Sequence, residues 1–77
     1  MNHLIGKLLR SKYNLYIEST KRFFDCRNPF VILEGYQDNR GGAQRGGWSF
    51  RILTTQGEMG WVWCHTVALE NFEEVTE

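Results

Sequence analysis

The sequence predicts an all-β domain, and three observations support this prediction. Phe, Trp and Tyr make up 14% of the residues, and aromatic residues favour strands. Apolar and polar residues alternate with a period of two in the most regular segments, which is typical of strands with one buried face. Glycine-containing turns separate these segments, and no segment has a helical period that would require a helix longer than about three turns.

Length and charge limit the kinds of protein that the chain can be. Its 77 residues predict a single domain over residues 1–77. Nine Lys and Arg balance nine Asp and Glu, which gives a formal net charge of zero. A protein whose main task is to bind nucleic acid usually has a basic excess, so the composition disfavours that task.

The cysteine count and the apolar runs predict where the chain works. Two cysteines are too few for a disulfide-rich secreted scaffold, and Lys7 and Arg10 interrupt the apolar N-terminal stretch. No run approaches the roughly 20 apolar residues that span a bilayer. We therefore expect a soluble, cytoplasmic protein that has no membrane partner.

The N-terminal half contains short strand signals between polar breaks. The segments "HLIGKLLR" and "YNLYIES" predict two strands or one long bent strand, because the second segment alternates. One side of the segment "YNLYIES" carries Tyr13, Leu15 and Ile17. The other side carries Asn14, Tyr16 and Glu18. Breaks follow at residues 19–22 and at Asn28-Pro29. The apolar run "FVIL" at residues 30–33 predicts a buried central strand.

The segment "WSFRILTTQGEMGWVWC" is the most regular part of the chain. It predicts two strands joined by a tight turn at residues 55–58, in which Gly57 takes a positive φ. Trp48, Phe50 and Ile52 alternate with Ser49, Arg51 and Leu53, and Met59, Trp61 and Trp63 alternate with Gly60, Val62 and Cys64. Residues 67–72 predict a 3₁₀ turn that leads into a short last strand. Residues 72–77 predict an acidic tail that frays.

The stretch from Trp48 to Val75 resembles the C-terminal half of an SH3-like small barrel of the bacterial type. The resemblance is carried by the hairpin spacing and by Gly57, Gly60, Trp61 and Val62. It implies a barrel of about five strands with one 3₁₀ turn, in which residues 11–28 form a long first loop. Free-standing chains of this kind are also similar to small proteins of tailed bacteriophages.

The resemblance does not extend to the groove with which eukaryotic SH3 domains bind proline-rich peptides. Trp63 stands where that groove has a Pro, and Thr66 stands where it has a Tyr. The Ala-Leu-Tyr-type motif near the start of those domains is also missing here. Only Trp48 has a counterpart, so proline recognition is not implied.

The stretch "NRGGAQRGGW" at residues 39–48 contains Arg-Gly-Gly twice. RNA-binding arrays of this motif are long, and a phosphate-binding P-loop needs Lys followed by Ser or Thr after its glycines. Four glycines between two strands indicate an open loop. Contact of Arg40 and Arg45 with an oligonucleotide or a phosphate stays open as the alternative.

Neither a metal centre nor a catalytic site follows from the cysteines and histidines. Cys26, Cys64, His3 and His65 have suitable ligand atoms for zinc, but no Cys-x-x-Cys occurs. Adjacent Cys64 and His65 point to opposite faces of a strand, which also prevents a nucleophile–base pair. We therefore expect no metal, no cofactor and no enzymatic activity.

The candidate binding residues are aromatic side chains together with arginines of the glycine-rich loop. They are Trp48, Trp63, Tyr36, Arg40 and Arg45. Aromatic side chains bury area in an interface, and arginines orient an acidic or planar partner group. For Trp48, Trp63 and Tyr36 the sequence leaves a core position and a surface position equally open, whereas Phe30, Phe50 and Val62 are expected in the core.

These observations predict a non-catalytic binding or adaptor module whose partner is a protein. One alternative is a single-stranded nucleic-acid binder that uses the same surface, because bases stack on aromatic rings. A second alternative is a structural protein that associates with itself through the edge strands of its barrel. Fold alone does not decide among the three.

Overall fold

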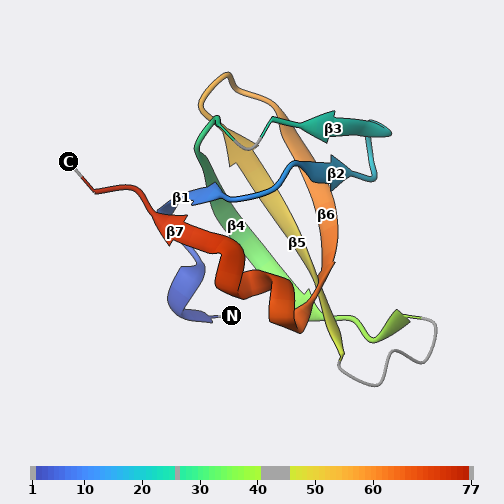
Figure 1. The fold of residues 1–77 in the computed structure, drawn as a ribbon. Coiled ribbons are helices and arrows are strands. Elements are labelled where there is room, and N and C mark those ends of the chain that lie inside the picture. Colours follow the sequence, from blue (N-terminus) through green and yellow to red (C-terminus); the bar gives the residue numbers. More distant parts are fainter. Residues whose placement is uncertain (1, 26, 41–45, 77) are drawn as a thin grey trace.

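The computed structural model describes residues 2–25, 27–40 and 46–76. One antiparallel sheet of seven strands curls into a half-barrel, with the order β3-β2-β6-β5-β4-β1-β7 (Figure 1). The strands are β1 (Leu8–Ser11), β2 (Leu15–Ile17), β3 (Arg22–Phe24), β4 (Phe30–Gln37), β5 (Gly47–Thr54), β6 (Met59–His65) and β7 (Phe72–Glu74). Two 3₁₀ helices are η1 (Asn2–Leu4) and η3 (Thr66–Asn71).

The predicted all-β class is confirmed, but the predicted count of about five strands is wrong. Three of the seven strands, β2, β3 and β7, are only three residues long. Strands β2 and β3 pair with each other inside the segment 11–28, which was expected to be a long loop. Strand β4, which was expected to be a buried central strand, lies in the interior of the sheet between β5 and β1, and β5 holds the middle place.

The central hairpin forms as the alternation predicts. Strands β5 and β6 pair over their whole length, with Phe50 opposite Val62. Gly57 has a φ of 86°, which confirms the predicted positive value. Its amide donates to the carbonyl of Thr54 at 3.0 Å, and the Thr54 amide donates to the carbonyl of Glu58 at 2.8 Å. The hydroxyl of Thr54 also accepts from the Glu58 amide at 3.1 Å.

The hydrophobic core lies inside the curl of the sheet. Phe30 and Phe50 are fully buried and Val62 is 1% exposed, which confirms their predicted core positions. Phe72 of β7 packs edge-on against both Phe30 and Phe50, with ring centroids 5.5 and 5.7 Å away. The other buried apolar residues are Leu4, Leu9, Leu15, Ile17, Phe24, Ile32 and Ile52. Because β7 supplies the ring that joins β4 to β5, the last strand completes the core.

A glycine lets β2 lie directly against β6. A Cβ atom on Gly60 would come within 2.3 Å of the Ile17 side chain. Ile17 pairs with Val62, and the amide of Glu18 donates to the carbonyl of Trp61 at 2.8 Å. This contact packs the β2–β3 hairpin against the central strands and places Glu18 beside β6.

The C-terminal segment forms η3 and then β7, which confirms the predicted 3₁₀ turn and last short strand. Residues 72–74 of the acidic end pair with β1, and the amide of Val75 donates to the carbonyl of Leu8 at 2.8 Å. Figure 1 shows β1 and β7 side by side. Within the described parts of the chain, no helix has the length and apolar character needed to cross a membrane.

Candidate binding face

The outer face of the sheet carries large aromatic side chains in register. On β4, β5 and β6, Tyr36 pairs with Ser49 and Ser49 pairs with Trp63, so the three residues form one row across the strands. They alternate along their strands with the buried core residues and therefore point away from the core. Tyr36 is 53% exposed, whereas Ser49 between the two rings is 1% exposed.

The same row continues over β2 and β3. The antiparallel register in which Ile17 faces Val62 brings Tyr16 opposite Trp63, and Tyr16 pairs with Phe23. The rings of Tyr16 and Phe23 meet edge-on at 5.2 Å, and the two residues are 43% and 71% exposed.

Trp61 belongs to the neighbouring row, and its ring contacts Tyr36 at 5.8 Å. The aromatic residues of both rows together are named the outer aromatic row from here on. They are Tyr16, Phe23, Tyr36, Trp61 and Trp63. The row crosses five strands of the sheet, so a partner lying on it would contact most of the outer face.

Trp63 is fixed in place by close contacts with the backbone. A Cβ atom on Gly47 would lie 2.3 Å from a ring carbon of Trp63, so only a glycine leaves room for the indole there. The indole Nε1–H donates to the carbonyl of Asp38 at 2.7 Å, and the His65 ring packs edge-on at 4.7 Å. The indole is therefore held rigidly while part of it remains accessible.

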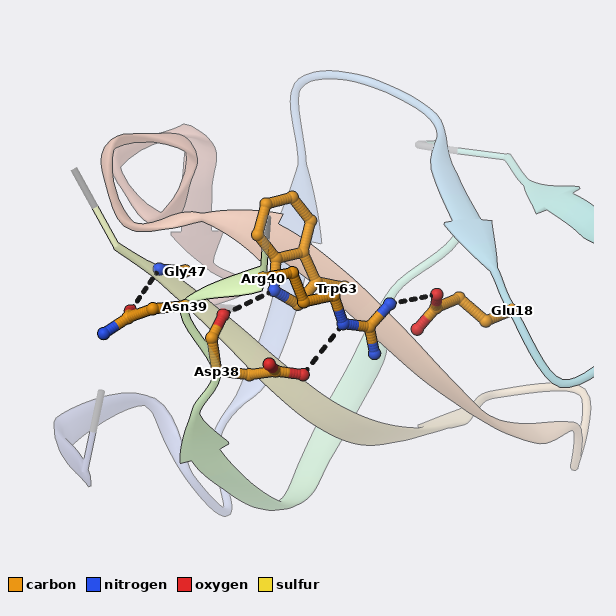
Figure 2. A network of polar contacts seen from close by, with 6 residues as sticks. All are labelled: Glu18, Asp38, Asn39, Arg40, Gly47 and Trp63. Atoms are coloured by element: carbon orange, nitrogen blue, oxygen red, sulfur yellow. Dashed lines mark hydrogen bonds and ion pairs between the residues drawn. The ribbon is translucent and has the colours of Figure 1, made fainter. Parts of the chain in front are cut away.

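Arg40 lies over the indole of Trp63 and is bonded to two carboxylates (Figure 2). Its guanidinium carbon is 5.8 Å from the ring centroid. Its Nε–H donates to Asp38 at 2.9 Å, and its Nη1 donates to the carboxylate of Glu18. The hydrogen bonds to Glu18 and then to Asp38 raise the pKa of Arg40 further above its usual value. These contacts hold the guanidinium on the protein's own surface.

The two ends of the glycine-rich loop are anchored to the sheet. The Asn39 side-chain oxygen accepts from the Gly47 amide at 3.1 Å, and the Asp38 amide donates to the Gly47 carbonyl at 2.8 Å. Gly46 has a φ of 73°, which glycine tolerates without strain. The loop expected from the glycines begins and ends here, and residues 41–45, including Arg45, lie outside the described residues.

A second arginine on this face is also paired. Arg51 donates from Nη2 to Glu34 at 2.7 Å, and its Nε is buried with no partner among the described residues. Across the described part of the face, the carboxylates of Glu18, Glu34 and Asp38 therefore outnumber the two arginines. A polyanion that approached the described part of this face would therefore meet few cationic side chains that are not already paired.

The structure brings together three of the five predicted binding residues. Tyr36 and Trp63 share a row, and Arg40 lies on Trp63. Trp48 is on the other face, where it pairs with Cys64 and packs against the core. Arg45 falls in the segment that is not described.

Sequence reasoning missed most residues of this face, among them Tyr16, Glu18, Phe23 and Trp61. Trp61 shares the parity of Trp63, and Tyr16 and Glu18 share the polar side of one alternating segment, so a signal existed for these three residues. Phe23 lies in a three-residue strand. A segment that short carries no periodicity, so nothing in the sequence marked Phe23 as part of the face.

A cavity of about 190 Å³ adjoins the aromatic row. Tyr16 and Trp63 line both the row and the cavity, and Leu15, Val62 and Phe72 line the deeper part. The cavity is mostly apolar and large enough for one side chain of a partner. It lies between β2, β6 and η3, next to two residues of the row.

Cys64 and His65 are separated by the strand, as predicted. Cys64 pairs with Trp48 on the inner side, whereas His65 packs against Trp63 on the outer side. Burial raises the pKa of the Cys64 thiol to about 11, so the thiol stays protonated at neutral pH and is a poor nucleophile. In the described segments, no group of three or more His, Cys, Asp or Glu side chains could hold a metal ion.

No protein-family model, curated protein or solved structure matches this chain. Its fold class, a curled antiparallel sheet compatible with a small barrel, rests on its own strand order. Its function has to be inferred from the outer face described above.

Proposed function

We propose that this protein is a non-catalytic binding module of the SH3-like type, which holds a protein partner on its outer aromatic row. The observation that carries the proposal is the gathering of five aromatic side chains on the face opposite the core. Partly exposed aromatic patches of this kind are typical of protein interfaces, where Tyr and Trp are enriched.

The SH3-like assignment is supported by the C-terminal half of the sheet. The glycine turn at Gly57, the 3₁₀ helix η3 and the short strand β7 follow one another as in small barrels of that type. In this proposal the module acts in the cytoplasm. If the protein is encoded by a bacteriophage, this is the host cytoplasm.

The geometry of the row suits a protein partner. Tyr and Trp bury a large area and lose little conformational entropy, since each has only two side-chain torsions. The ion pair between Arg51 and Glu34 lies beside Trp61 and supplies directional polar contacts at the margin. The cavity next to Tyr16 can accept one apolar side chain. Aromatic anchors with a polar margin and a recess are the usual parts of an interface.

The charges of the face favour protein over single-stranded nucleic acid. Bases could stack on the aromatic rings, which keeps nucleic acid as the second candidate. However, Arg40 and Arg51 are each bonded to carboxylates, and the whole chain has a net charge of zero. A phosphate backbone would have to replace those carboxylates and would then face them as like charges.

Affinity capture with the full chain as bait tests the proposal. We expect the wild type to retain a protein from its native cell extract, with and without nuclease. The double variant Tyr16→Ala, Tyr36→Ala should lose that protein, because both side chains are exposed members of the row. The variant Val67→Ala should retain it, because Val67 is exposed on η3 outside the row.

Three results would contradict the proposal. Loss of capture after nuclease treatment would indicate nucleic acid. Equal retention by all three baits would place the interface elsewhere. Recovery of only further copies of the chain would indicate self-association, for which the edge strands β3 and β7 are available.

A further inference from the structure

The guanidinium of Arg40 occupies a site that the tertiary fold builds. Glu18 follows β2, Asp38 follows β4 and Trp63 lies on β6 (Figure 2). Glu18 is 22 residues from Arg40 in the chain, and Asp38 is 25 residues from Trp63. The three residues that surround the guanidinium are called the cation cradle below.

The cradle has the chemistry of a site for an organic cation. An indole face attracts a guanidinium or an ammonium group, and two carboxylates accept its hydrogen bonds. The side chains of Asp38, Glu18 and Arg40 are 22%, 36% and 43% exposed, so the cradle is open to solvent on one side. A cation from outside can therefore reach it.

The indole of the cradle and the backbone at Glu18 and Asp38 are held by contacts other than those with Arg40. The indole of Trp63 is held by its contact with Gly47 and by its bond to the Asp38 carbonyl. The Asp38 backbone is held by its bond to the Gly47 carbonyl. If the Arg40 side chain swings away, the indole face stays in position, and the carboxylates of Glu18 and Asp38 remain on a fixed backbone without their counter-charge.

We propose that the cation cradle binds an arginine or lysine side chain of the protein partner, and that Arg40 is an internal occupant which this side chain displaces. The inference rests on the proposed function, because the cradle includes Trp63 of the outer aromatic row. It differs from the expectation from the sequence that Arg40 would orient an acidic or planar partner group. The partner segment that lies on this part of the row is basic.

The balance of hydrogen bonds distinguishes a basic partner from an acidic one. A basic side chain exchanges with Arg40, so that Glu18 and Asp38 remain bonded and Arg40 is released into water. An acidic side chain would draw Arg40 away and leave both carboxylates without a partner, next to a further negative charge. Leaving charged groups unpaired is more costly than exchanging one cation for another.

Removing the internal occupant should strengthen binding of a cation. If the cradle is unoccupied about a tenth to a third of the time, Arg40→Gln raises the apparent affinity for a basic ligand by about three- to tenfold. The variant Arg40→Lys keeps an occupant and should bind much as the wild type does. Glu18→Gln should weaken binding, and Lys7→Gln, which removes a cation elsewhere on the surface, is the matched control.

A titration followed by nuclear magnetic resonance measures this effect without knowledge of the partner. The probe is the N-acetyl amide of arginine, and the same derivatives of citrulline and glutamate serve as the neutral and acidic comparisons. The readout is the indole Nε1–H resonance of Trp63, assigned with Trp63→Phe. We expect the arginine derivative alone to shift this resonance, at about three- to tenfold lower concentration in Arg40→Gln than in the wild type.

Three results would overturn the inference. These are no shift with the arginine derivative in any variant, equal or weaker binding in Arg40→Gln, and a shift produced by the glutamate derivative instead. Failure of the inference about the cation cradle can be distinguished from failure of the proposed function. If the Tyr16 and Tyr36 variant loses its captured protein while Arg40→Gln gains nothing, the binding face is correct and only the cation cradle is wrong.

Discussion

The two faces of β4, β5 and β6 differ in chemistry although they alternate along the same strands. On the inner face, Phe50, Ile52 and Val62 are at most 1% exposed and uncharged. On the outer face, Arg51 and Trp61 remain partly exposed, and charges lie between the rings. The inner face forms the core, and the residues of the outer aromatic row lie outside it.

The largest expected difference comes from truncating one ring on each face. Phe50→Ala should cost about 3–5 kcal/mol, since it leaves a cavity in the core. A domain of this size has a total stability of only about 5 kcal/mol, so the variant should retain at most about 2 kcal/mol and unfold at a much lower urea concentration. Tyr36→Ala on the outer face should cost less than about 1 kcal/mol. Far-ultraviolet circular dichroism during urea unfolding measures both, and equal losses would show that the outer row is part of the core.

A smaller effect is expected at Gly47, where the outer face depends on the backbone beneath it. Gly47→Ala places a Cβ atom 2.3 Å from the indole of Trp63. The indole must move, at a cost of about 1–3 kcal/mol, and tryptophan fluorescence should shift to the red. The double variant Gly47→Ala, Trp63→Leu should recover part of this stability, because the two sites are in contact. Strict additivity of the two single variants would contradict the contact.

The smallest effect concerns the turn that joins the two central strands. Gly57→Val should cost somewhat more than about 1 kcal/mol, because a β-branched residue is strained at a φ of 86°. No neighbouring atom lies within 4 Å of the added Cβ, so the cost comes from the backbone alone. Gly57→Asn should cost less, since Asn tolerates positive φ.

Gly57→Val also tests whether the two faces unfold together. Unfolding followed by circular dichroism and by tryptophan fluorescence, to which the outer Trp61 and Trp63 contribute, should shift to the same midpoint. Different midpoints would mean that the outer face unfolds separately from the sheet. In that case the outer aromatic row would not share the stability of the core behind it.

The sequence predicted the fold well where its strands are long. Strands β5 and β6 have eight and seven residues, so the alternation is long enough to assign both faces and the turn between them. Strands β2, β3 and β7 have three residues each, and their pairing is decided by tertiary contacts such as that of Ile17 with Gly60. The alternation at residues 13–19 and the last short strand were still predicted, whereas the three residues of β3 carry no local pattern, so the strand count was too low.

The binding face could be predicted only in part. Alternation placed Trp48 with Phe50 and Ile52, which was already a signal for its inner position. The surroundings of Arg40 could not be predicted, because Glu18 reaches it only through the register of β2 on β6. A guanidinium in a glycine-rich loop therefore appeared available for an acidic partner, although the fold supplies it with two carboxylates.

The pairing of β1 with β7 bears on how the protein forms during synthesis. Leu9 on β1 faces Glu74 on β7, so strands from the two ends of the described chain must meet. Contacts between residues so distant in sequence slow folding, because a long loop must close before they form. Phe72 also reaches the core only with this strand. Until residues 72–74 have been synthesised, Phe30 and Phe50 lack the ring that packs against both of them and β1 lacks its outer partner, so the complete sheet requires β7.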